Sequence, residues 1–166
     1  MQCNSAYMEQ KGVKQSILFL VNPQSGVSKK KRVPQMIGQY VDHERYDADI
    51  CYTQYAGHAY ELAKDAAARG VDVVVAVGGD GTVNEVARAL VHTATALGVI
   101  PCGSGNGFAR HLGIPIGVKS AVEFINTAEP VFVDYGNILK RKKRKAWKPS
   151  SCISAFVPYS ASTART

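Results

Sequence analysis

The sequence predicts an α/β fold, a layered parallel sheet with helices on both faces. Two observations indicate this class. Short runs rich in Val, Ile and Leu alternate along the chain with segments of helical period, and glycine-rich turns follow three of the runs. With 166 residues, 46% of them hydrophobic, the chain is long enough to bury the core of one domain.

Five short apolar runs predict the strands. Unbroken runs of β-branched residues are typical of strands that are covered on both faces, and residues 71–77 form the strongest of these runs. The predicted strands span residues 17–21, 46–53, 71–77, 97–100 and 131–134, of which 46–53 has the weakest pattern.

Segments with apolar residues at helical spacing lie between these strands. Gly70 follows one of them and is suited to stop a helix. Thr82 and Glu85 have the T-x-x-E spacing of a capping box, which predicts the start of another helix. The predicted helices span residues 33–40, 58–69, 83–90 and 119–127.

Right-handed crossovers would bring every glycine-rich turn to the carboxyl edge of one sheet, where such folds bind ligands. In residues 78–82, backbone N–H groups and a helix dipole can meet a phosphate. Asp80 would repel that phosphate unless it binds a cation such as Mg²⁺, takes a proton from an acceptor, or is itself held by hydrogen bonds. The alternative is a helix-entry turn in which Asp80 caps free N–H groups.

Two further turns contain suitable groups. Asn22, Ser25 and Gly26 follow the first strand, where amide and hydroxyl groups can bind phosphate or ribose, although a simple Asx turn cornered by Pro23 is the alternative. Residues 103–110 combine glycines with a hydroxyl, an amide and a final arginine, a suitable lining for a polyphosphate. The alternative is that this arginine, Arg110, is only a solvated residue on a helix.

The positive charge is confined to the end of the chain. The net charge is +7, yet residues 137–166 hold eight basic and no acidic residues, which leaves 12 basic and 13 acidic residues in 1–136. A nucleic-acid or anionic-lipid partner would therefore depend on this tail and its basic run, 140–145. Because the tail has no amphipathic period, we interpret it as non-functional and do not expect a nucleic-acid partner.

The cysteine spacing and the lack of long apolar stretches predict where in the cell the protein is found. No apolar stretch approaches the roughly 18 residues of a membrane span, and the first residues lack the apolar region of a signal peptide. A cytoplasmic location is therefore expected, with peripheral contact to a membrane surface still open. Four widely separated cysteines without metal-ligand spacing are expected to be reduced thiols: Cys3, Cys51, Cys102 and Cys152.

The three turns together form a recognisable set. Their motifs are Asn22-Pro23-x-Ser25-Gly26, Gly78-Gly79-Asp80-Gly81-Thr82-x-Asn84-Glu85-Val86 and Pro101-x-Gly103-Ser104-Gly105-Asn106-Gly107-Phe108-Ala109-Arg110. In this order they resemble the catalytic domain of the diacylglycerol kinase and sphingosine kinase family, over roughly residues 15–136. The resemblance implies a Rossmann-like nucleotide-binding domain related to those of NAD kinases and phosphofructokinases.

The resemblance also implies an activity and a set of site residues. Members of the family use ATP and Mg²⁺ to phosphorylate a lipid hydroxyl, with Asp80 in the place of the catalytic and Mg²⁺-site aspartate. His58, in the matching turn that opens a helix, is interpreted as a helix-start residue and not as a base. The residues expected to bind the nucleotide are Asn22, Ser25, Gly26, Thr53, Gly79, Asp80, Gly81, Thr82, Asn84, Glu85, Gly103, Ser104, Gly105 and Asn106.

The expected organisation is an N-terminal lead at 1–14, the nucleotide-binding domain at 15–136, and a basic tail without regular structure at 137–166. Nothing after Gly136 resembles the β-rich second domain of the family, so little kinase activity and self-association through exposed apolar surface are expected of the chain alone. A lipid at the membrane surface is the expected substrate. The alternatives are an NAD kinase-like enzyme and a non-catalytic module that binds nucleotide or uses its basic tail.

Overall fold

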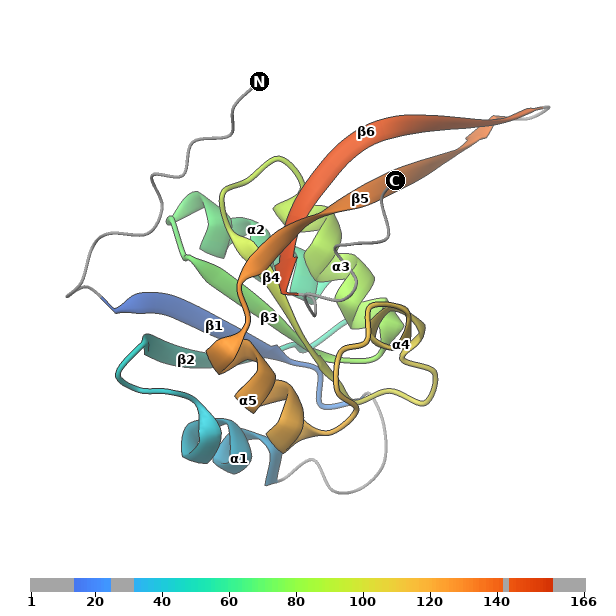
Figure 1. The fold of residues 1–166 in the computed structure, drawn as a ribbon. Helices are drawn as coiled ribbons and strands as arrows, with labels where there is room; N and C mark the ends of the chain where they lie inside the picture. Colours follow the sequence, from blue (N-terminus) through green and yellow to red (C-terminus); the bar gives the residue numbers. More distant parts are fainter. Residues whose placement is uncertain (1–13, 25–31, 142–143, 157–166) are drawn as a thin grey trace.

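A computed structural model describes residues 14–24, 32–141 and 144–156 of the chain. Their strands form one sheet in the order β2-β1-β3-β4-β6-β5 (Figure 1). The strands are β1 (Gln15–Val21), β2 (Tyr46–Tyr52), β3 (Val73–Gly78), β4 (Ala96–Pro101), β5 (Pro130–Arg141) and β6 (Arg144–Phe156). The helices are α1 (Val33–Tyr40), α2 (His58–Ala68), α3 (Asp80–Leu90), α4 (Gly107–His111) and α5 (Val118–Thr127).

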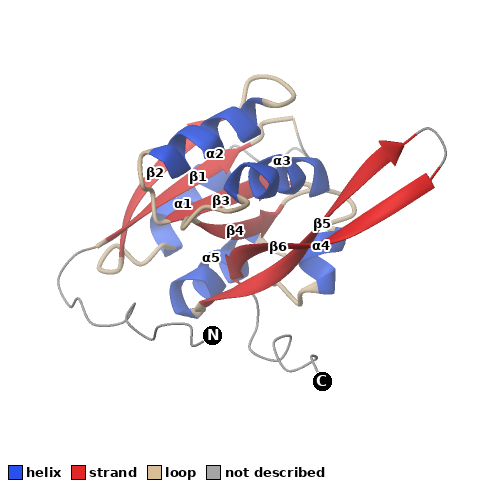
Figure 2. Ribbon diagram, turned by 90° about the horizontal axis from the view of Figure 1, so that it is seen from above, coloured by secondary structure: helices blue, strands red, loops and turns tan. Residues whose placement is uncertain are grey.

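Helices cover both faces of the sheet, as the sequence predicts. α1 and α5 pack on one face, and α2 and α3 on the other (Figures 1 and 2). The strand β1 shows why its sequence is apolar throughout: Phe19 is buried in the core under α1 and α5, while its neighbour Leu20 is buried in the core under α2 and α3. The predicted α/β fold is confirmed.

The last two strands depart from the predicted parallel sheet. β1, β2, β3 and β4 pair in parallel, but β5 and β6 form an antiparallel hairpin that joins β4 only through the pair Leu97 and Ala155. The segment 144–156 is a strand where the sequence suggests no regular structure. Antiparallel strands can be joined by a tight hairpin and need no crossover helix, so the pattern of strands alternating with helices does not predict them. The predicted lead at 1–14 lies almost wholly outside the described residues.

The strand order creates the place for a site. The chain passes from β1 outward to β2, and then returns to the other side of β1 to form β3 and β4. In an open parallel sheet, the point where the order reverses leaves a crevice at the carboxyl ends of the strands. Here that point lies between β1 and β3, directly before the turns that begin at Asn22 and Gly79.

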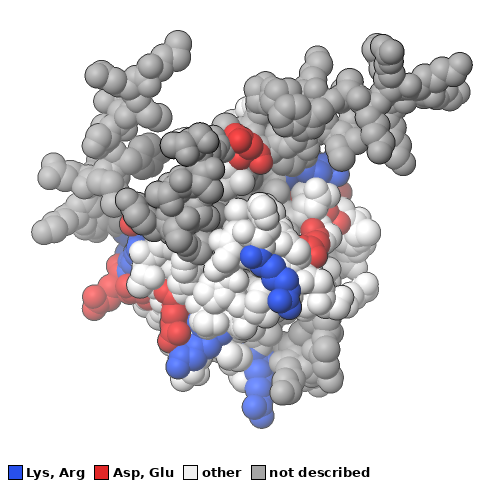
Figure 3. All heavy atoms as spheres, turned by 45° about the vertical axis from the view of Figure 1, so that its right-hand side comes forward, with Lys and Arg blue, Asp and Glu red and all other residues white. Residues whose placement is uncertain are grey.

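Charged side chains are spread over the face of the molecule that Figure 3 shows. On the face shown in Figure 3, acidic and basic side chains are scattered, with no patch of one sign. No helix within the described ranges is both long and apolar enough to cross a membrane. The side chains of the basic run at 140–145 are outside what the structure describes, so the interpretation of this run remains a prediction.

Candidate functional site

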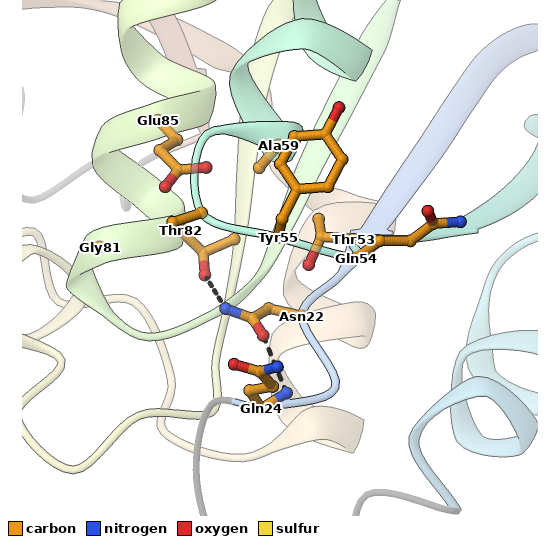
Figure 4. A pocket seen from close by; sticks show the side chains of 10 residues that line it. Asn22, Gln24, Thr53, Gln54, Tyr55, Ala59, Gly81, Thr82 and Glu85 are labelled. Atoms are coloured by element: carbon orange, nitrogen blue, oxygen red, sulfur yellow. Dashed lines mark hydrogen bonds between the residues drawn. The ribbon is translucent and has the colours of Figure 1, made fainter.

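A pocket of about 160 Å³ lies at the reversal point of the sheet. It is bounded by the segments that follow β1 and β2 and by the first turns of α2 and α3 (Figure 4). The residues that line it are Asn22, Gln24, Thr53, Gln54, Tyr55, Ala56, Ala59, Gly81, Thr82 and Glu85. Half of these were expected from the sequence: Asn22, Thr53, Gly81, Thr82 and Glu85.

Sequence reasoning missed the segment between β2 and α2. Gln54, Tyr55 and Ala56 belong to no glycine-rich motif, although they follow a strand whose carboxyl end meets the same sheet edge. That position was the signal that could have identified them. Two backbone bonds extend the parallel ladders to this edge: the N–H of Asn22 donates to the carbonyl of Val77 (3.1 Å), and the N–H of Thr53 to that of Val21 (2.9 Å).

Asn22 connects two walls of the pocket. Its Nδ2 donates to Thr82 Oγ1 at 3.1 Å, and its Oδ1 accepts from the backbone N–H of Gln24 at 2.9 Å. The second bond makes the Asx turn that the sequence left open as an alternative. Thr82 is only 5% exposed, so its hydroxyl is held at the pocket wall. Asn22 and Thr82 therefore fix the opening of α3 relative to the end of β1.

The predicted capping box at Thr82 and Glu85 is wrong. α3 begins at Asp80, with Gly79 as its N-cap residue, so Thr82 already lies inside the helix. Glu85 Oε1 instead accepts the backbone N–H of Gly57 at 3.0 Å, which links α3 to the start of α2. Gly57 has φ +91°, a conformation that strains any residue with a Cβ atom. Glu85 therefore binds a residue 28 positions earlier in the chain instead of capping its own helix.

Three other expected residues form a closed contact, which we call the glycine junction (Gly79, Gly103 and Asn106). A Cβ atom at Gly103 would come within 2.6 Å of Gly79 Cα. Asn106 Oδ1 accepts from the N–H of Gly103 (2.9 Å), and its Nδ2 donates to the carbonyl of the same residue (2.8 Å). Asn106 is 5% exposed and has φ +53°. Its amide thus holds the loop against the turn before α3.

Asp80 faces this junction from the first position of α3. Its carboxylate accepts the backbone N–H groups of Gly107 (Oδ2) and Phe108 (Oδ1), both at 3.1 Å, and thereby caps α4. These hydrogen bonds hold the pKa of Asp80 below its usual value, with a smaller contribution from the backbone of Asn106. Asp80 therefore does cap N–H groups, but they belong to α4 and not to the helix entry that the sequence suggested as the alternative.

The arrangement fits Mg²⁺ bound together with phosphates, and does not fit a metal held by the protein alone. The described residues contain no cluster of three or more His, Cys, Asp or Glu side chains that could hold a metal ion. Mg²⁺ usually keeps several waters and binds one or two carboxylates plus substrate phosphates. Asp80 is exposed, and a carboxylate with about four acceptor sites has capacity beyond its two backbone bonds.

The remaining expected residues are divided. Asn84, Ser104 and Gly105 are exposed, and none of them lines the pocket. Arg110 is exposed on α4, and its Nε donates to the carbonyl of Gly105 at 3.1 Å. His58 begins α2, as the sequence predicts. Ser25 and Gly26 lie outside the described residues.

These features define a class of protein. A parallel sheet with helices on both faces carries a pocket at its reversal point, beside the N-terminus of α3. This is the arrangement of α/β domains that bind phosphate-containing ligands. Residues 16–138 match the family described as the diacylglycerol kinase catalytic domain, and the chain belongs to that family.

Individual relatives agree with the family match. Over 125 residues the chain is 40% identical to a diacylglycerol kinase of Bacillus subtilis (strain 168), covering 72% of this chain and 41% of that protein. It is 39% identical over 95 residues to a probable lipid kinase YegS-like of Pseudomonas syringae pv. tomato, covering 56% of this chain and 31% of that protein. The chain therefore spans less than half the length of these relatives.

Solved structures share the fold. A putative diacylglycerol kinase from Bacillus anthracis str. Sterne superposes with a TM-score of 0.64 at 30% identity, covering 74% of this chain and 46% of that one. A second diacylglycerol kinase structure from the same organism gives a TM-score of 0.62 at 26% identity, covering 77% and 48% of the two chains. The predicted family and fold are thus confirmed, and the NAD kinase-like alternative is not the one that these matches favour.

Proposed function

We propose that this chain binds ATP with Mg²⁺ and supplies the nucleotide side of a lipid kinase. The observation that carries the proposal is the pocket that joins Asn22, Thr53 and Thr82 next to the start of α3. The first turn of α3 presents backbone N–H groups and the positive end of its dipole, which attract phosphate. The family match supports phosphoryl transfer as the reaction class.

The proposed chemistry is transfer of the γ-phosphoryl group to a lipid hydroxyl, such as that of diacylglycerol or a sphingoid base. The lipid oxygen bonds to the γ-phosphorus while the bond to the bridging oxygen of ADP breaks, and the hydroxyl proton passes to a base. When bound, Mg²⁺ would neutralise charge on the phosphates. Asp80 is the residue that we assign to hold the ion.

The low pKa of Asp80 helps to define its role. A carboxylate whose pKa lies below its usual value is ionised at neutral pH and is a weak proton acceptor. It is therefore better suited to hold a cation and to orient the acceptor hydroxyl than to remove a proton early. Phosphoryl transfer with a loose transition state needs little early proton removal, so this role agrees with the reaction.

The test measures ATP binding to the whole chain by calorimetry, with Mg²⁺ and with EDTA. We expect binding that requires Mg²⁺ and that Asp80→Ala weakens about tenfold or more, because the only carboxylate assigned to the ion is removed. Asp65→Ala is the matched control, since Asp65 is exposed on α2 and pairs only with Arg69 among the ion pairs of the described residues (2.9 Å). ATP binding should be unchanged in this variant.

Turnover is measured in the same preparations with diacylglycerol and with sphingosine in detergent micelles. Lipid phosphorylation that disappears in Asp80→Ala and persists in Asp65→Ala would support the full reaction and identify the preferred lipid. The proposal fails if the wild-type chain binds no ATP in the presence of Mg²⁺, or if Asp80→Ala binds ATP as tightly as the wild type does.

A further inference from the structure

Tyr55 is a large aromatic residue of the pocket to which the proposed function assigns no role. It lies between β2 and α2, lines the pocket, and leaves 54% of its surface exposed. Figure 4 shows Asn22 and Gln24 at one end of the pocket and Tyr55 and Ala59 at the other. Burial in the core therefore does not account for a tyrosine at this position.

The ring of Tyr55 is held in place although it is exposed. It stacks on the imidazole of His58, with centroids 4.5 Å apart and planes inclined by 11°. Its hydroxyl donates to Glu61 Oε2 at 2.6 Å, and His58 Nδ1 accepts the backbone N–H of Gln54 at 3.1 Å. A ring fixed at both ends loses little freedom when a ligand stacks on it.

The Tyr55 hydroxyl is paired with Glu61. Because Glu61 accepts a hydrogen bond from the phenolic O–H, the pKa of Tyr55 is raised above its usual value. The side chain therefore places no negative charge beside a bound nucleotide at physiological pH. His58 stacks on one face of the ring, and Tyr55 still leaves 54% of its surface exposed beside the pocket.

The two ends of the pocket differ in chemistry. Around Asn22, Gly81 and Thr82 lie amide, hydroxyl and backbone N–H groups at the start of α3, which suit phosphate. At the other end, Tyr55 is accompanied by Ala56 and Ala59, which offer apolar contact.

Glu85 lies along the same pocket, where its carboxylate would repel a phosphate and accept hydrogen bonds from sugar hydroxyls. These preferences give a bound nucleotide a direction. The phosphates would lie at α3 next to Asn22, the sugar near Glu85, and the base at the end where Tyr55 lies.

We propose that Tyr55 is the platform on which the nucleobase stacks, and that it orients the nucleotide with its phosphates toward Asp80. The inference rests on the proposed nucleotide-binding function and adds the residue that distinguishes a nucleotide from a bare polyphosphate. Stacking of a base on an aromatic side chain changes binding by about tenfold or more when the ring is removed.

The test compares the affinities of MgATP and of magnesium tripolyphosphate for the whole chain by calorimetry. Tyr55→Ala should weaken MgATP binding about tenfold and leave tripolyphosphate binding unchanged. Tyr55→Phe keeps the ring but loses the bond to Glu61, so it should bind MgATP far more tightly than Tyr55→Ala does and tripolyphosphate as the wild type does. Tyr52→Ala is the matched control, because Tyr52 is 51% exposed three residues earlier and does not line the pocket. It should bind both ligands normally.

A second readout follows the ring itself. A base that stacks on Tyr55 should shift the His58 ring signals in the proton NMR spectrum when ATP is added, and tripolyphosphate should not. The inference is overturned if the wild type binds ATP but Tyr55→Ala binds it equally well, or if Tyr55→Ala weakens ATP and tripolyphosphate by the same factor. Absence of ATP binding by the wild type would instead overturn the proposed function.

Discussion

The pocket and the glycine junction lie at the same edge of the sheet and are made from the same kinds of residue, but they are opposite in design. In the pocket, Asn22 and Thr82 bond to each other in the wall of a hollow that a ligand can enter. In the junction, the side-chain amide of Asn106 makes two hydrogen bonds to the backbone of Gly103, and the loop packs against Gly79. The first region is arranged to receive a ligand, and the second holds the walls in place.

The difference explains why glycine serves two purposes here. At Gly103 a side chain has no room, because another backbone occupies the space. At Gly81 nothing lies within 4 Å of the place where a Cβ atom would be, so the missing side chain leaves open space beside the pocket. One glycine allows two chain segments to touch, and the other leaves the start of α3 accessible.

The largest expected effect is a difference in the free energy of unfolding between alanine variants of these two glycines. Gly103→Ala should lower the free energy of unfolding by about 1–3 kcal/mol, because its Cβ atom would meet Gly79 Cα at 2.6 Å and the backbone must shift. Gly81→Ala should raise it by at most about 1 kcal/mol, since alanine favours a helix. Urea unfolding measures both. Equal stabilities of the two variants would contradict the contrast between junction and pocket.

A smaller effect is expected on ligand binding when the bond between Asn22 and Thr82 is removed. Thr82→Val keeps the shape of the side chain but removes the hydroxyl that accepts from Asn22, which should weaken ATP binding several-fold, as expected for a lost hydrogen bond of about 1 kcal/mol. Thr95→Val is the control: Thr95 is equally buried, and its hydroxyl donates to Val71 at the opposite edge of the sheet (2.8 Å). Calorimetry should show normal ATP binding in this variant, and a loss as large as that of Thr82→Val would refute the prediction.

The smallest expected effect is a pH dependence at Asp80. Its folded-state pKa lies below the ordinary value of 3.8, so the contact with α4 stabilises the fold above that value and is lost as the pH falls through and below it. The unfolding free energy of the wild type should therefore decrease more steeply below about pH 5 than that of Asp80→Asn. Because Asp80 is exposed, solvent keeps the difference small. Parallel curves for the two proteins would disprove the contribution.

Much of the fold follows from local pattern. Every strand of the parallel sheet was predicted within about two residues of its observed bounds, because an apolar run covered on both faces has a clear signature. Gly70 ends α2 as expected, with φ +78° directly after the helix. The five-residue helix α4 was not predicted, since its start depends on Asp80, 27 positions earlier in the chain.

The candidate site was also predictable only in part: its location follows from local pattern, and the role of each residue does not. Residue types and their position after strands were enough to place Asn22 and Thr82 at one edge of the sheet, and the family resemblance added Thr53. What each polar group does there depends on its partners. Glu85 has the spacing of a local cap but binds Gly57, and the amide of Asn106 suits a phosphate but closes a loop.

The sequence by itself determined the class of fold, the edge that carries the site and the family to which the chain belongs. Apolar periodicity and motif spacing are local properties, and a reader of the chain alone has access to them. Only the tertiary structure decided which small and polar residues line the pocket and which ones pack against each other. It also placed Tyr55 in the lining of the pocket. The reason is that hydrogen bonds and close contacts join segments tens of residues apart, and their partners are chosen by packing.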